Sequence, residues 1–143
     1  MPMLEALPVA AYAGIAVVIL MIAMGRRMSG AIRWIFPVAL GAAFLFFTIF
    51  AIGREGLSLF WDNHTTNLAG NQVWLDLLFA VTIAFYLIAP RARAVGMPLL
   101  PWAVAVAITA SIALLPMLAR VIWLEQRAGR QQPAMPVPGL LGE

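Results

Sequence analysis

The sequence lacks cysteine entirely, and it contains a single histidine among 143 residues. Without cysteine the chain cannot form a disulfide or hold an iron–sulfur cluster, and thiol catalysis is excluded. A lone histidine with no paired histidine nearby makes a poor metal site, so we expect neither a metal nor any other cofactor. Charged residues are equally scarce, at 10% of the chain against about 25% in an ordinary soluble domain.

The sequence consists largely of long apolar segments, and 64% of its residues are hydrophobic. A water-soluble fold of this composition would expose large apolar patches and aggregate. A helix that crosses a bilayer needs about 20 predominantly apolar residues, and the chain is long enough for four. We therefore predict an all-α fold, an integral membrane bundle of four transmembrane helices.

The boundaries of these elements follow from the runs of apolar residues and from the prolines. Pro90 ends the third segment because proline disfavours helix at the residue before it, and Pro116 predicts a kink within the fourth. Residues 1–126 would form the transmembrane domain, and the proline- and glycine-rich residues 127–143 an extended tail. The predicted spans are residues 7–24, 32–52, 73–89 and 101–124.

A polar segment, residues 53–72, separates the second and third spans and holds the only histidine, His64. Leu57, Phe60 and Trp61 have the spacing that places side chains on one face of a short helix. Such a helix would lie in the membrane interface, with Trp61 at the depth of the lipid head groups. The segment would either cap the bundle or form a lid over a site.

Asp76 lies about one turn inside the third span, where an ionisable side chain is costly and normally faces protein or water. Helical spacing places it on one stripe that we expect to face the bundle interior: Gln72, Asp76, Phe79, Ile83 and Tyr86. Arg120 lies about one turn before the end of the fourth span. If all four spans cross, Asp76 and Arg120 have similar depths, and we predict a structural ion pair between them.

The arginines give the orientation, because basic loops stay on the cytoplasmic side of a membrane. The loops after the first and third spans are more basic than the opposite side. We predict the bacterial inner (cytoplasmic) membrane, with both termini in the periplasm. The loop arginines are Arg26, Arg27, Arg33, Arg91 and Arg93, and those opposite are Arg54, Arg127 and Arg130.

Six short matches within residues 60–125 carry a likeness to known proteins: Phe60, Asp76-Leu77-Leu78, Arg93, Gly96-Met97, Leu115-Pro116 and Leu124-Glu125. On these matches, the segment resembles a family of small uncharacterised bacterial membrane proteins of the domain-of-unknown-function class. The resemblance implies a membrane-embedded helical fold in which Asp76 and Pro116 recur. It implies no activity.

The thin inventory of catalytic groups favours an accessory subunit of a larger membrane complex, or a binder of lipid or another hydrophobic ligand. The expected partners are membrane lipids and a larger complex or a second copy, and no nucleic acid, because the arginines lie in short loops that orient membrane proteins. The candidate ligand-binding residues are Trp61, Trp74, Asp76, Tyr86 and Arg120.

The alternative is a membrane-embedded enzyme acting on an isoprenoid or lipid substrate. Asp76 would then donate or accept the proton with help from His64, and the aromatic side chains would stabilise cationic character. This alternative requires Asp76 to face a cavity.

Overall fold

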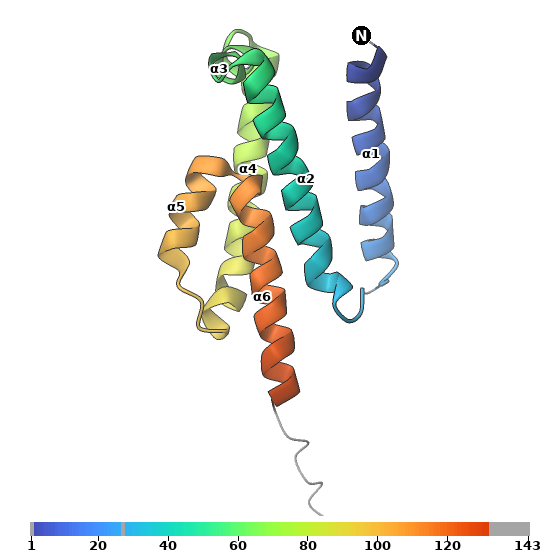
Figure 1. The fold of residues 1–143 in the computed structure, drawn as a ribbon, viewed down its shortest axis with the longest axis vertical. Coiled ribbons are helices and arrows are strands. Elements are labelled where there is room, and N and C mark those ends of the chain that lie inside the picture. Colours follow the sequence, from blue (N-terminus) through green and yellow to red (C-terminus); the bar gives the residue numbers. More distant parts are fainter. Residues whose placement is uncertain (1, 27, 132–143) are drawn as a thin grey trace, which may run out of the picture. The chain divides into compact units, whose positions relative to one another are not determined.

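The computed structural model describes residues 2–26 and 28–131, which contain helices and no strand, so the all-α prediction is confirmed for this part of the chain (Figure 1). The helices are α1 (Pro2–Ala23), α2 (Ile32–Glu55), α3 (Ser58–Thr65), α4 (Leu68–Ala94), α5 (Leu99–Thr109) and α6 (Ser111–Gln131). Three of them are long and apolar enough to cross a membrane, over Ala6–Ala23 in α1, Ile32–Glu55 in α2 and Leu68–Ala94 in α4. These helices indicate a membrane-embedded protein.

The chain divides into two compact units, Met1–Ile32 and a second unit that begins at Arg33. The first unit contains α1, and every α1 side chain from residue 6 onward is exposed except Val18, which is intermediate. The second unit contains α2 to α6 and all of the buried side chains. Helix α1 therefore contributes nothing to the buried core of the described chain.

The segment expected to form the fourth span, residues 101–124, is not one helix. It is broken at Ala110, where φ is 49° and ψ is −119°, a backbone conformation that non-glycine residues rarely adopt. Helix α5 runs back along α4, and α6 returns in the opposite direction (Figure 1). At 1.5 Å per residue α5 is only about 16 Å long, too short for a hydrocarbon core of about 30 Å. The prediction of one continuous helix over residues 101–124 is wrong, because this segment forms a helical hairpin.

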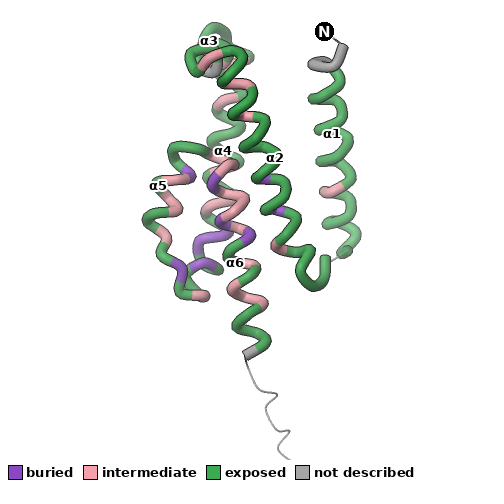
Figure 2. Tube along the Cα trace, in the orientation of Figure 1, coloured by how far each residue is buried: buried purple, intermediate pink, exposed green. Residues whose placement is uncertain are grey.

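The hairpin exists because it buries apolar side chains that a straight helix would leave apart. Val106 of α5 and Ala113, Met117 and Val121 of α6 join Ile88 and Ala92 of α4 in one core cluster. Met117 and Val121 are completely buried. Figure 2 shows these buried residues where α4, α5 and α6 meet.

Helix α4 continues through Pro90, where the sequence predicted its end. Two alanines of the same turn, Ala89 and Ala92, are 7% and 0% exposed. Packing of this turn offsets the hydrogen bond that proline cannot donate. Residues 127–131, assigned to an extended tail, belong to α6, and residues 132–143 lie outside the described part of the chain.

Helix α2 meets α6 at Gly41. A Cβ atom built at this position would lie 3.3 Å from Cβ of Leu115 and 3.5 Å from Cδ of Pro116. Pro37 and Gly41 are the buried residues of α2. A small residue at such a crossing allows two helix backbones to approach closely, which is how helices associate in lipid.

We expect Ala110→Gly to stabilise the protein by about 1 kcal/mol, because glycine adopts positive φ without a steric penalty. Ala107→Gly, in the interior of α5, should instead destabilise it by about the same amount. Unfolding of both variants in mixed micelles by titration with a denaturing detergent measures the difference. Equal effects of the two substitutions would contradict the backbone strain at Ala110.

Candidate functional site

A corner between α3 and α4 forms a candidate site in the second unit, and local hydrogen bonds explain why the chain turns there. Asn67 is extended, and its side-chain oxygen caps α4 by accepting a 2.7 Å hydrogen bond from the Gly70 amide. The Asn71 side-chain amide donates to the Asn67 carbonyl at 3.0 Å. At the end of α3, the Thr65 hydroxyl donates to the Trp61 carbonyl at 2.8 Å.

Gly70 allows the two helices to touch. A Cβ atom at this position would lie 2.8 Å from the carbonyl oxygen of Asn63 and 3.2 Å from Cα of His64. Both atoms belong to the α3 backbone, which cannot move aside as a flexible side chain would. Glycine is therefore required here for the start of α4 to pack against the end of α3.

This close approach builds an open pocket of about 210 Å³, lined by Leu57, Trp61, His64, Thr65 and Trp74, which we call the aromatic pocket. The imidazole of His64 and the indole of Trp74 lie 5.3 Å apart, with a tilt of 53° between their planes. This separation lies in the range preferred by interacting aromatic rings. Trp61, one of the lining residues, is 65% exposed.

The chemistry of the aromatic pocket is dominated by apolar surface. The Thr65 hydroxyl already donates its proton to the Trp61 carbonyl, which leaves the oxygen as an acceptor. No group of three or more histidine, aspartate and glutamate side chains able to hold a metal ion occurs in the described residues. A hydrophobic chain or ring fits these walls better than a charged ligand.

Two of the predicted ligand-binding residues, Trp61 and Trp74, come together in this pocket, and His64 joins them. Thr65 was missed by the sequence analysis, although Leu57, Trp61 and Thr65 are spaced every four residues. That spacing puts them on one face of α3 and was the available signal. The short helix predicted within residues 53–72 is confirmed as α3.

Asp76 is not one of the residues that line the pocket. All five residues of its stripe are exposed, so the prediction that the stripe faces the interior of this unit is wrong. The interior face of α4 instead carries Val81, Phe85, Ile88 and Ala92. Polarity suggested that Asp76 would turn inward, whereas the apolar side chains determine which face packs against α5 and α6.

The predicted ion pair between Asp76 and Arg120 is not formed, and both side chains are exposed. Glu125 instead pairs with Arg91, accepting hydrogen bonds of 2.8 Å from Nε and 2.7 Å from Nη2. This two-pronged contact places the end of α6 beside the end of α4. Arg120 is five residues before Glu125 and hence level with Tyr86, about 15 Å along the helix axis from Asp76.

Tyr86 and Arg120, the remaining predicted ligand-binding residues, therefore lie away from the aromatic pocket. Tyr86 is 75% exposed on the outer face of α4. Comparison of the chain with protein-family models, with curated proteins and with solved structures found no match. The family resemblance of residues 60–125 stays a prediction.

We expect Gly70→Ala to destabilise the α3–α4 corner by about 1–3 kcal/mol, because the added methyl group would collide with the α3 backbone. Gly53→Ala, in α2, is the matched control because nothing lies within 4 Å of a Cβ atom there. Detergent-induced unfolding and tryptophan fluorescence would report the change. Equal stability of the two variants would contradict the close approach at Gly70.

Proposed function

We propose that this protein is a small integral membrane protein that binds a lipid or another hydrophobic ligand in the aromatic pocket. The observation that supports the proposal is the pocket itself, an open space of about 210 Å³ with two indole rings and one imidazole in its walls. Ligand sites are typically concave and mostly apolar, with a few polar groups that orient the ligand. His64 and Thr65 supply the polar groups, and an alkyl chain or a planar ring fills the remaining space.

The position of the pocket suits a ligand drawn from the membrane. It lies where α3 packs against the start of α4, beside the polar residues that precede the apolar part of that helix. Tryptophan prefers this boundary between head groups and hydrocarbon. A lipid tail or an isoprenoid could enter sideways past Trp61, whose side chain is largely exposed.

A photoreactive fatty acid carrying a diazirine tests this proposal in vesicles that contain the purified protein. We expect cross-links to concentrate in residues 57–74 and excess oleate to suppress them. Leu57→Trp should reduce this labelling several-fold, because the larger side chain fills the pocket. Leu68→Trp is the control, since Leu68 is 89% exposed and lies outside the pocket. Labelling spread evenly over the apolar helices would contradict a defined site.

For the orientation, we propose that the α3 side faces the periplasm and the end of α6 faces the cytoplasm of a bacterial inner membrane. The hairpin at Ala110 supports this change from the sequence prediction, because it returns α6 to the side where α4 ends. Arginines then gather on that side of the second unit, and only Arg54 lies near α3. Those on the α6 side are Arg33, Arg91, Arg93, Arg127 and Arg130. Such an imbalance favours the cytoplasm.

The absence of cysteine makes this orientation easy to test with single cysteines. Ser58→Cys in α3 should react with a membrane-impermeant maleimide in intact cells. Gly129→Cys in α6 should react only after the cells are opened. Both positions are exposed. Labelling of Gly129→Cys in intact cells would contradict this orientation, because it would put the C-terminal end of α6 in the periplasm.

A second candidate function, as an accessory subunit of a larger membrane complex, is favoured by Asp76. This exposed carboxylate lies about one turn inside the apolar part of α4, and no described residue of the chain pairs with it. Aspartate in a transmembrane segment is costly, and such residues normally pair within a protein or face water. A neighbouring subunit with a basic or hydroxyl side chain would satisfy it.

Purification in a mild detergent tests the subunit hypothesis. We expect a co-purifying membrane protein that is lost in Asp76→Asn and retained in Glu55→Gln, which removes a carboxylate near α3. A wild-type protein that migrates alone, or only as a homodimer, would count against it. The enzyme alternative has less support, because His64 lines the aromatic pocket and Asp76 does not.

A further inference from the structure

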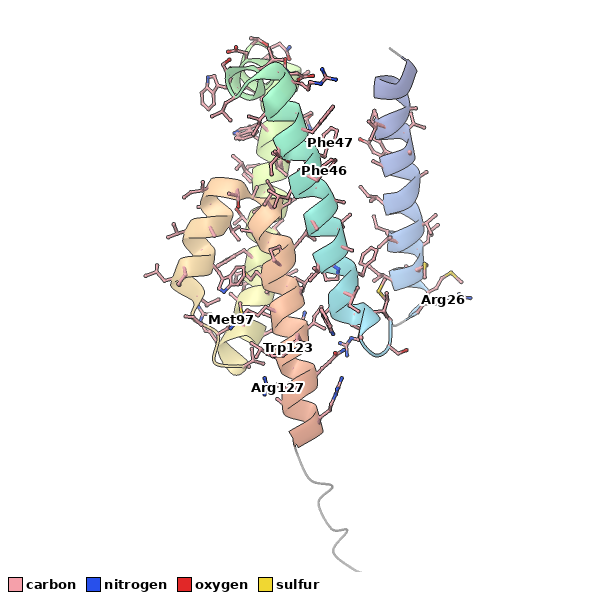
Figure 3. The ribbon with its side chains drawn as sticks, viewed as in Figure 1. Arg26, Phe46, Phe47, Met97, Trp123 and Arg127 are labelled. Carbon is pink, nitrogen blue, oxygen red and sulfur yellow. The ribbon has the colours of Figure 1, made fainter. Side chains whose placement is uncertain are left out.

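One face of α6 carries a row of exposed arginines around a tryptophan. Arg120, Trp123, Arg127 and Arg130 follow one another at intervals of three, four and three residues, which places them on the same face of a helix. All four side chains are exposed, and the Arg127 guanidinium lies 5.3 Å from the centre of the Trp123 ring (Figure 3). We call these four residues the α6 basic stripe.

The packing of α6 determines where this stripe points. Ala113, Met117 and Val121 lie on a neighbouring face, about 100° around the helix from the stripe. They are 8%, 0% and 0% exposed in the core shared with α4 and α5. The helix cannot rotate about its axis without pulling these side chains out of the core. The α6 basic stripe is therefore held on the outside of the second unit.

The stripe has no carboxylate partner within the described chain. Glu125 is the one acidic residue of α6, and both of its oxygens accept hydrogen bonds from Arg91. Arg127 makes its contact with an aromatic ring, and no ion pair involves Arg120 or Arg130. Three positive charges are thus left without a carboxylate partner among the described residues.

The Arg91–Glu125 contact also gives the depth of the stripe, because Arg91 marks the end of the apolar part of α4. Trp123 lies near this boundary, where tryptophan rings collect. Arg127 and Arg130 lie beyond it, and Arg120 lies about 7 Å inside. An arginine at this depth of a bilayer extends its guanidinium group toward the head groups while its methylene groups stay in the apolar layer.

We propose that the α6 basic stripe is a docking surface for the head groups of anionic phospholipids. A guanidinium group matches a phosphate with two parallel hydrogen bonds, so each arginine can hold one lipid phosphate. Trp123 anchors the helix at the interface, and its ring holds the Arg127 guanidinium through a cation–π contact. A soluble acidic protein fits less well, because Arg120 lies at the depth of the lipid rather than in water.

This surface is separate from the aromatic pocket, so the two proposals can fail independently. Each basic residue near an anionic membrane surface is worth about fivefold in binding. Loss of all three arginines should therefore reduce the preference for an anionic lipid by up to about a hundredfold. The affinity for a zwitterionic lipid should not change.

The test uses the full chain in phosphatidylcholine vesicles that contain a trace of diazirine-labelled phosphatidylglycerol or phosphatidylcholine. We expect the phosphatidylglycerol probe to label residues 118–131 far more than the phosphatidylcholine probe does. The triple variant Arg120→Gln/Arg127→Gln/Arg130→Gln should abolish this difference. The substituted side chains are exposed, and circular dichroism and gel filtration verify the fold.

The control removes the same charge elsewhere, as Arg33→Gln/Arg54→Gln/Arg93→Gln, and should keep most of the preference. If both triple variants lost the preference for phosphatidylglycerol equally, net charge alone would explain the preference, and the proposal would be overturned. Protection by millimolar glycerol phosphate would indicate a site for free phosphate instead. Displacement of the lipid probe by a short polyglutamate peptide would assign the surface to an acidic protein.

Discussion

Ala110 ends α5 and lets α6 begin in the opposite direction, with a positive φ that few non-glycine residues adopt. This reversal brings the last turns of α6 to the end of α4, where Glu125 meets Arg91 through two hydrogen bonds. The core of the second unit lies between the three helices so arranged. Without the reversal Val106 could not pack against Ala113, and Glu125 would lie on the side of α3.

The reversal gives the second unit two ends of different chemistry. At one end, α3 and the start of α4 enclose the aromatic pocket, with one arginine, Arg54, close by. At the other end, α2, α4 and α6 each carry arginines, and Glu125 pairs with one of them, Arg91. A ligand taken from the apolar layer suits the first end, and the phosphates of a membrane surface suit the second. The two proposed activities would therefore take place on opposite faces of one bilayer.

Between the two ends, the outer face of α4 is largely apolar, and Asp76 is its one carboxylate. Helices in lipid gain little from the hydrophobic effect and associate through close packing and polar contacts. Helix α2 buries only Pro37 and Gly41, so a large part of the apolar surface is free to meet lipid or another subunit. No described residue pairs with this carboxylate, and lipid is a poor neighbour for it, which is the basis of the proposed contact with another subunit.

The sequence alone determined the helical class, the three long apolar helices and the short helix α3, because these depend on local composition and on spacing along the chain. Two of the candidate binding residues that it offered, Trp61 and Trp74, line the same pocket. The predicted end of the third span at Pro90 was wrong. The burial of Ala89 and Ala92 offsets the missing hydrogen bond, and that burial is a tertiary effect. The depth of Arg120, the partner of Glu125 and the face of Asp76 all depend on the reversal at Ala110. No glycine or proline marks that residue, and only the packing of α5 against α4 and α6 decides that the chain turns there.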